Sequence, residues 1–152
     1  EDVAEYGTGS TAQMFALAER LALAGCAFTT IVHGRFDTHA DVQRLLEPKL
    51  GILDRALSTL IRRLWERRED EVIVTACTEF GRTPVLNEYA GRDHWPNASC
   101  ALVTKRGGGV YGSTGSDGDA STGIVTPEVL RNTVLAAAGQ RFQTNQFVQQ
   151  AI

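Results

Sequence analysis

The sequence lacks a cysteine framework, a long apolar run and an excess of basic charge, and each absence excludes a class of protein. Its three cysteines, Cys26, Cys77 and Cys100, are too far apart for a disulfide scaffold or a thiolate zinc motif, so we expect small buried apolar residues. A net charge of −3 gives no electrostatic footprint for nucleic acid. No apolar run approaches the roughly 18 residues of a membrane span, and the N-terminus has no basic segment followed by an apolar one. The chain as given is expected to be soluble, and cytoplasmic in the form given, although the sequence does not assign a compartment; neither nucleic acid nor membrane is expected as a partner.

Helical periodicity occurs in three stretches of the chain. With 152 residues, the sequence has the length of one domain, and we expect residues 1–152 to form it. The predicted helices cover residues 10–25, 42–68 and 126–139. The second is expected to be disturbed near Pro48. The glutamine-rich tail after the third helix is left unassigned.

The longest predicted helix is amphipathic. Apolar residues from Leu46 to Leu64 recur at steps of three and four, and Arg62 and Arg63 fall on the opposite face. This pattern predicts a helix that packs its leucine stripe into the core and keeps both arginines in solvent.

Three short apolar segments are predicted to be strands. They are residues 27–32, 71–77 and 101–104, and they alternate with the helices along the chain. This order is typical of an α/β fold with a mostly parallel sheet. The glycine-rich residues 107–123 are expected to form a surface excursion without regular structure. In a parallel sheet, a ligand site lies beyond the carboxyl ends of the strands.

Polar residues gather where two of these strands end, and all three histidines are among them. His33, Asp37 and His39 follow the first strand, Glu79 and Arg82 follow the second, and Arg92, Asp93 and His94 come later in the same loop. Side chains two positions apart in extended chain point to one side, so Asp37 and His39 are suited to bind one ion. Histidine with carboxylates favours Zn, Mn or Fe over Ca. A divalent metal site is the first hypothesis.

Simpler interpretations remain beside this hypothesis. Each Asp/His pair occurs often in solvated loops, and His33 is more often bonded to backbone than to metal. Arg82 and Arg92 are the candidate catalytic residues that would clamp an anionic substrate, but ion pairs with Glu79 or Asp93 would explain them equally well. Trp95 would either wall a pocket or pack in the core.

Four motifs in order resemble the bacterial DUF1501 family, which is similar to the alkaline phosphatase and sulfatase superfamily. The resemblance runs from about Tyr6 to Gly139. The matching residues are Phe36-Asp-Thr-His39, Glu79-Phe-Gly-Arg-Thr-Pro84, Asn87 and Gly91-Arg-Asp-His-Trp-Pro96, and the resemblance continues through Gly109-Val-Tyr-Gly112 and Val125-Thr-Pro-Glu128.

The resemblance implies a three-layer α/β/α sandwich that hydrolyses phosphate or sulfate esters with divalent metals. It implies that the ion is held by two kinds of ligand, carboxylates and imidazoles, from Asp37, His39, Glu79, Asp93 and His94. The substrate would be a small anionic ester, neutralised by Arg82 or Arg92.

The resemblance covers only the C-terminal half of such an enzyme, because the superfamily's nucleophile comes before these motifs. Glu79-Phe80 also stands where other phosphatases carry Asp-His. The alternative function is therefore a non-catalytic binding or self-assembly module, acting as a homo-oligomer or with a partner that supplies the missing half.

Overall fold

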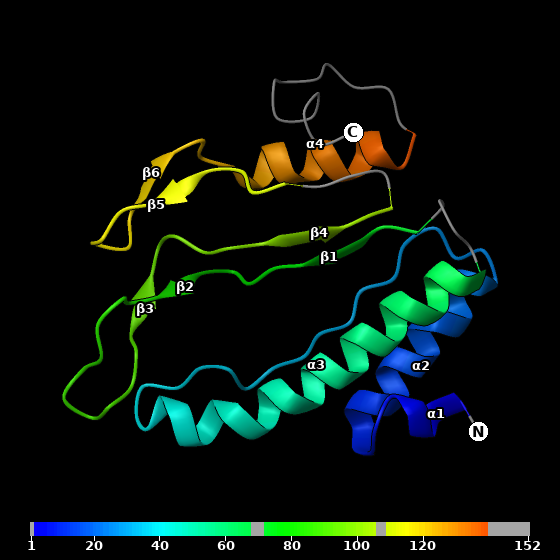
Figure 1. Cartoon of the computed structure of the whole chain (residues 1–152), viewed down its shortest axis with the longest axis horizontal. Coiled ribbons are helices and arrows are strands. Elements are labelled where there is room, and N and C mark those ends of the chain that lie inside the picture. Colours follow the sequence, from blue (N-terminus) through cyan, green and yellow to red (C-terminus); the bar gives the residue numbers. More distant parts are fainter. Residues whose placement is uncertain (1, 68–71, 106–108, 140–152) are drawn as a thin grey trace. The chain divides into compact units, whose positions relative to one another are not determined.

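The computed structural model describes residues 2–67, 72–105 and 109–139, which form two compact units (Figure 1). The first unit combines residues 1–69 with residues 86–93, and the second combines residues 70–85 with residues 94–152. Within the described ranges, no helix is both long enough and apolar enough to cross a membrane. The glutamine-rich tail, residues 140–152, lies outside the described part of the chain.

Three helices build the first unit. They are α1 (Asp2–Glu5), α2 (Gly9–Leu23) and α3 (Val42–Arg67), so both long helices predicted for this part of the chain are confirmed. The disturbance expected at Pro48 is wrong, because α3 runs through that residue as one helix. Proline has no N–H, so its place in the helix leaves one carbonyl of the preceding turn without its usual donor.

Helix α2 packs on α3, and the two supply most of the core of the first unit. Alanine at four of the buried positions lets the two helices approach closely. Leu50 and Ile52 of α3 stay about half exposed, so only the C-terminal part of the predicted leucine stripe is core. The buried apolar residues are Tyr6, Ala12, Phe15, Ala16, Ala18, Ala56, Leu60 and Leu64.

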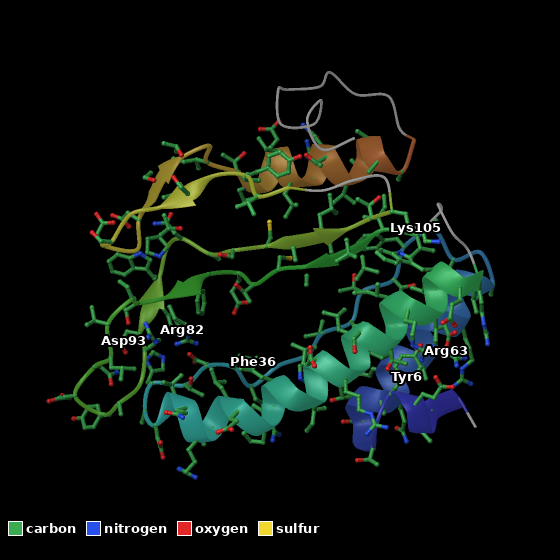
Figure 2. The ribbon with its side chains drawn as sticks, in the orientation of Figure 1. Tyr6, Phe36, Arg63, Arg82, Asp93 and Lys105 are labelled. Atoms are coloured by element: carbon green, nitrogen blue, oxygen red, sulfur yellow. The ribbon has the colours of Figure 1, made fainter. Side chains whose placement is uncertain are left out.

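A buried ion pair joins α2 to α3 inside this core. Arg63 Nε donates to both carboxylate oxygens of Glu19, at 2.9 and 3.0 Å, and Tyr6 Oη donates to Glu19 Oε2 at 3.0 Å. The guanidinium also bonds Glu5 at 2.9 Å. Figure 2 labels Tyr6 and Arg63 in this region. The expected solvent position of Arg63 is therefore wrong, because the buried Glu19 carboxylate draws it into the helix interface.

Tyr6 is expected to give the protein an alkaline instability. Burial, followed by the hydrogen bond to Glu19, raises the pKa of Tyr6 above its ordinary value. A group with a higher pKa in the folded state adds stability below its unfolded pKa of about 10 and loses that contribution as the pH rises further. The free energy of unfolding should therefore fall above pH ~10 more steeply in the wild type than in Tyr6→Phe. Urea denaturation across alkaline pH measures both slopes, and equal slopes would contradict this assignment.

Short antiparallel strands build most of the second unit. β1 (Val74–Ala76) pairs with β4 (Ala101–Val103), and β2 (Gly81–Arg82) pairs with β3 (His94–Trp95). Both pairs lie along one two-stranded ribbon, since β2 continues from β1 and β4 continues from β3 (Figure 1).

The predicted parallel sheet is wrong for the described residues, because all three strand pairs there are antiparallel. The fold is mixed helix and strand, as predicted, but the sheets of the described residues have two strands each, so the three-layer α/β/α sandwich that the resemblance implied is not supported. The predicted strands 71–77 and 101–104 do exist as β1 and β4, and Glu71 lies outside the described residues. Apolar runs identify strands, but they do not fix the direction in which two strands pair.

A hairpin and a helix complete the second unit. β5 (Ser113–Thr114) pairs with β6 (Ala120–Thr122), so the surface excursion predicted for residues 107–123 contains regular structure. Trp95 is half-buried, and its indole N–H donates to the carbonyl of Gly118 in the hairpin turn at 3.1 Å. Helix α4 (Pro127–Ala137) confirms the third predicted helix, with Thr126 Oγ1 accepting from the N–H of Val129.

Residues 27–32 are not a strand, which corrects the third strand prediction. They run as irregular chain, and Phe28 and Val32 are each 79% exposed. Cys26, Cys77 and Cys100 are also exposed rather than buried. Each of the three lies next to a predicted strand, and each would be covered only if those strands formed the interior of a layered sheet.

Candidate functional site

Two segments far apart in sequence meet in the first unit and carry the candidate site. Residues 38–42 lie beside residues 89–92 through an isolated bridge between Ala40 and Ala90. The N–H groups of Asp41 and Val42 donate to the carbonyls of Tyr89 and Ala90, both at 2.9 Å. Because backbone hydrogen bonds hold the two segments together, they fix the backbone positions from which the side chains of the site extend.

Gly91 makes this close approach possible. A Cβ at position 91 would meet the carbonyl group of His39 and the backbone nitrogen of Ala40, both far inside contact distance. Backbone atoms cannot turn away as a flexible side chain can. Only glycine fits here, which explains the glycine of the Gly-Arg-Asp-His motif.

His39 lies between two carboxylates. Its Nδ1 is 2.7 Å from Asp93 Oδ1, and its Nε2 is 3.0 Å from Asp37 Oδ1. The side chains are 49% exposed for His39, 61% for Asp37 and 54% for Asp93, so a small ion reaches them directly from solvent. Three of the five predicted metal ligands are therefore together in one unit.

The two contacts of His39 impose a condition on the imidazole. Neutral imidazole has one N–H, so it can donate to only one of the two carboxylates. The other ring nitrogen then faces a carboxylate oxygen with lone pairs on both atoms. A cation between Nε2 and Asp37 Oδ1, either a proton or a metal ion, removes this repulsion.

Asn87 lies among the residues that resemble the family, but the sequence predicted no role in the site for it. Its Nδ2 donates to the carbonyl of His39 at 3.0 Å and to Asp93 Oδ1 at 3.2 Å. Its Oδ1 accepts from the N–H groups of Tyr89 and Gly91, at 3.0 and 2.9 Å. An asparagine side-chain oxygen that accepts from backbone N–H groups two and four residues later forms an Asx-type turn. Asparagine in a loop is a sequence signal for such a turn, and this signal was present here.

The remaining predicted residues of the Glu-Phe-Gly-Arg-Thr and Asp-His motifs belong to the second unit. Arg82 is paired in register with His94 across β2 and β3. The His94 ring stacks on Phe80 with centroids 3.9 Å apart, and the Arg82 guanidinium lies 5.4 Å from the centre of the same Phe80 ring. Glu79 is exposed in the turn before β2. Arg82 and His94 therefore lie against the same Phe80 ring.

Arg92 and His33 have different surroundings in the first unit. The backbone N–H of Arg92 donates to the backbone carbonyl of the buried Thr38 at 3.2 Å, and the Arg92 residue is half-buried. His33 is away from the carboxylates, with Nδ1 3.5 Å from Thr11 Oγ1 and its ring edge-on to Phe36. Its Nε2 is buried without a hydrogen-bond partner among the described residues. The expected backbone partner of His33 is thus replaced by a hydroxyl.

This geometry defines the class of protein: a mixed helix-and-strand chain with an exposed Asp-His-Asp cluster. Residues 1–150 match the model of a family described as "Protein of unknown function (DUF1501)", and the chain belongs to this family. No curated protein and no solved structure matches the chain.

Proposed function

We propose that the protein is a metal-dependent hydrolase-like domain that acts on phosphate or sulfate esters. The observation that carries the proposal is His39 with both ring nitrogens on carboxylate oxygens, at 2.7 and 3.0 Å. A divalent cation between Nε2 and Asp37 Oδ1 satisfies both atoms at once. Imidazole with carboxylate oxygen is a ligand set that suits Zn, Mn or Fe.

The spacing of the two donor atoms fits such an ion. Ligands about 2.0–2.1 Å from one tetrahedral zinc ion lie roughly 3.3 Å from each other. Nε2 of His39 and Oδ1 of Asp37 are 3.0 Å apart, which needs only a small outward movement of two exposed side chains. Glu79 and His94 stay sequence-based predictions as further ligands.

The ester chemistry assigned to this site follows from the ion and from the arginines. A bound divalent ion supplies a Lewis acid that polarises a phosphoryl or sulfuryl oxygen. Arg92, between Gly91 and Asp93 in the chain, is proposed to neutralise the anionic ester, and Arg82 remains the second candidate for this role. For this chain alone, water is the proposed nucleophile: its oxygen would bond to the phosphorus or sulfur atom as the ester P–O or S–O bond breaks, and a proton from that water would go to the departing ester oxygen.

The motif similarity supports a further part of this proposal. The chain would correspond to the C-terminal portion of an alkaline phosphatase-like or sulfatase-like protein, and in the longer protein the preceding portion would supply a nucleophile in place of water. The test is to compare ester hydrolysis by this chain alone with hydrolysis by the same chain extended at its N-terminus.

Metal content is the first experiment on the proposed site. Protein purified without chelators should carry close to one Zn, Mn or Fe ion per chain, and His39→Ala should lose it because the variant removes one of the two donors. Elemental analysis measures both, with His33→Ala as the matched control because His33 contacts Thr11 and Phe36 instead. Hydrolysis of phosphate and sulfate monoesters should follow metal content. A wild type and a His39→Ala variant that are equally free of metal would contradict the proposal.

The exposed apolar residues of the first unit favour a second candidate function, a self-assembly module. Phe28 and Val32 are each 79% exposed on a segment without a strand partner among the described residues. Apolar side chains presented this way are a common basis of association. Light scattering should then give the mass of an oligomer for the wild type and of a monomer for Phe28→Ser/Val32→Ser. The control is Val110→Ser, since Val110 is 96% exposed in the other unit.

A further inference from the structure

We propose that Asp93 and Asn87 are positioning residues that hold His39 in one tautomer, with the proton on Nδ1 and the Nε2 lone pair presented to the ion. This inference rests on the proposed metal site. It changes the role of Asp93 from the ligand expected from sequence to a partner of the ligand. It also gives a role to Asn87, which no motif had assigned.

The first step is the direction of the hydrogen bond between Asp93 and His39. An ionised carboxylate only accepts, so neutral His39 donates its single proton either to Asp93 or to Asp37, and the contact of Nδ1 with Asp93 Oδ1 is the shorter one, at 2.7 Å. The contact of Nε2 with Asp37 is longer, at 3.0 Å. We therefore assign the single proton of neutral imidazole to Nδ1, which leaves Nε2 to face Asp37 and the ion.

The second step is that Asn87 orients the Asp93 carboxylate, which in turn orients the His39 ring. The Oδ1 atom of Asp93 accepts from both His39 Nδ1 and Asn87 Nδ2. The same Nδ2 group also donates to the carbonyl of His39, so one amide group holds both ends of the Asp93–His39 pair. The backbone carbonyl of His39 and, through Asp93, its ring are thereby both held by the Asn87 side chain.

The third step is the orientation of the Asn87 amide itself. Its two N–H donors reach a carbonyl and a carboxylate, and its oxygen accepts from two backbone N–H groups. All four hydrogen-bonding positions of the amide are used. The reverse orientation would set N–H against N–H and oxygen against oxygen at every contact, so the network admits one orientation only.

The carboxylate–histidine–metal arrangement has a known effect on metal affinity. A carboxylate on the second ring nitrogen orients a ligating histidine and raises its basicity, and its loss costs about 10–100-fold in metal affinity. Two variants isolate this effect. Asp93→Ala removes the acceptor, and Asp93→Asn keeps an oxygen that accepts from Nδ1.

The experiment measures Zn²⁺ affinity by competition with a chromophoric chelator and the His39 tautomer by ¹⁵N–¹H NMR. We expect Asp93→Ala to weaken Zn²⁺ binding about 10–100-fold, and Asp93→Asn to recover most of that loss. We expect Asn87→Asp to weaken binding similarly. That variant keeps the oxygen for Tyr89 and Gly91, so the turn stays intact, but it loses both Nδ2 donors. Glu88→Ala, an exposed neighbour in the same turn, is the matched control.

Three outcomes would overturn the inference. Asp93→Asn as damaging as Asp37→Asn would make Asp93 a ligand. Asn87→Asp with wild-type affinity would remove the role of Asn87. A metal-free wild type with the proton of neutral His39 mainly on Nε2 would also overturn it.

The NMR readout separates this inference from the proposed function. A wild type that binds no Zn²⁺ but keeps His39 protonated on Nδ1, with the proton moving to Nε2 in Asp93→Ala, would support the positioning role and reject the metal site. A purely structural role of Asp93 would leave the tautomer unchanged.

Discussion

Replacing Arg63 with alanine should remove about 3–5 kcal/mol from the free energy of unfolding, because it leaves the Glu19 carboxylate buried without its main partner. Glu19 is 1% exposed, so water cannot take over the lost hydrogen bonds. Arg67 is 3.5 Å from the same carboxylate but is half exposed, and it replaces little of the lost interaction. A domain with a total stability of about 5–15 kcal/mol loses a large fraction of it in this variant. Urea denaturation at neutral pH measures the difference.

Arg62→Ala is the matched control for Arg63→Ala, because it removes the same residue type one position earlier on α3. Arg62 bonds Glu5 and Glu66 in solvent, and exposed pairs contribute little to stability. The double variant Glu19→Leu/Arg63→Met should recover part of the loss, since it removes both buried charges together. An Arg63→Ala protein as stable as Arg62→Ala would show that the buried pair does not hold α2 and α3 together.

Gly91→Ala should lose the proposed metal binding and at least about 3 kcal/mol of stability, the upper end of overpacking costs. The added methyl group would meet the backbone of His39 and Ala40, so the two site segments must separate for it to fit. Separation breaks the backbone bonds of residues 41 and 42 to residues 89 and 90. It also withdraws Asp93 and Asn87 from His39, so stability and Zn²⁺ affinity should fall together.

Gly34→Ala is the control for this prediction, because a Cβ at position 34 meets nothing within 4 Å. That substitution should leave both stability and Zn²⁺ affinity unchanged. Denaturation and chelator competition on the two variants give the comparison. A Gly91→Ala protein with wild-type Zn²⁺ affinity would contradict the close approach of the segments on which the site depends.

The helices were predictable because their periodicity reports which face is buried. The heptad-like spacing of α3 gave its bounds to within a residue of Arg67, and Thr126 with Pro127 marked the start of α4. The same pattern placed Arg63 wrongly. An arginine opposite a leucine stripe is normally in solvent, and only the burial of Glu19 on another helix reverses this.

The strands were predicted less well because pairing depends on partners far away in sequence. Residues 27–32 have the β-branched composition of a strand, but they are irregular and mostly exposed, and no strand of the described residues pairs with them. Val74 and Leu102 have the composition of interior strand residues, yet β1 and β4 pair antiparallel. Nothing in a short apolar run specifies direction.

The sequence predicted Asp37, His39 and Asp93 among its candidate ligands, and the structure brings these three side chains together, while their function as metal ligands stays a prediction. Asp37, His39 and Asp93 were identified from residue type and position after a predicted strand. Whether a carboxylate approaches a metal or a ring nitrogen depends on distances of a few tenths of an ångström, and spacing along the chain carries no such information. Asn87 acts only through hydrogen bonds, which leave a weak turn signal in the sequence.

The discontinuous first unit has a consequence for the order of synthesis. His39 and Asp93 are separated by 54 positions, and a ribosome adding about 5–20 residues per second needs several seconds to cover that distance. During this interval the nascent chain carries Asp37 and His39 without the loop that orients them. A ligand that depends on the orientation of His39 can therefore bind only after residue 93 has emerged from the ribosome, which places its binding late in translation.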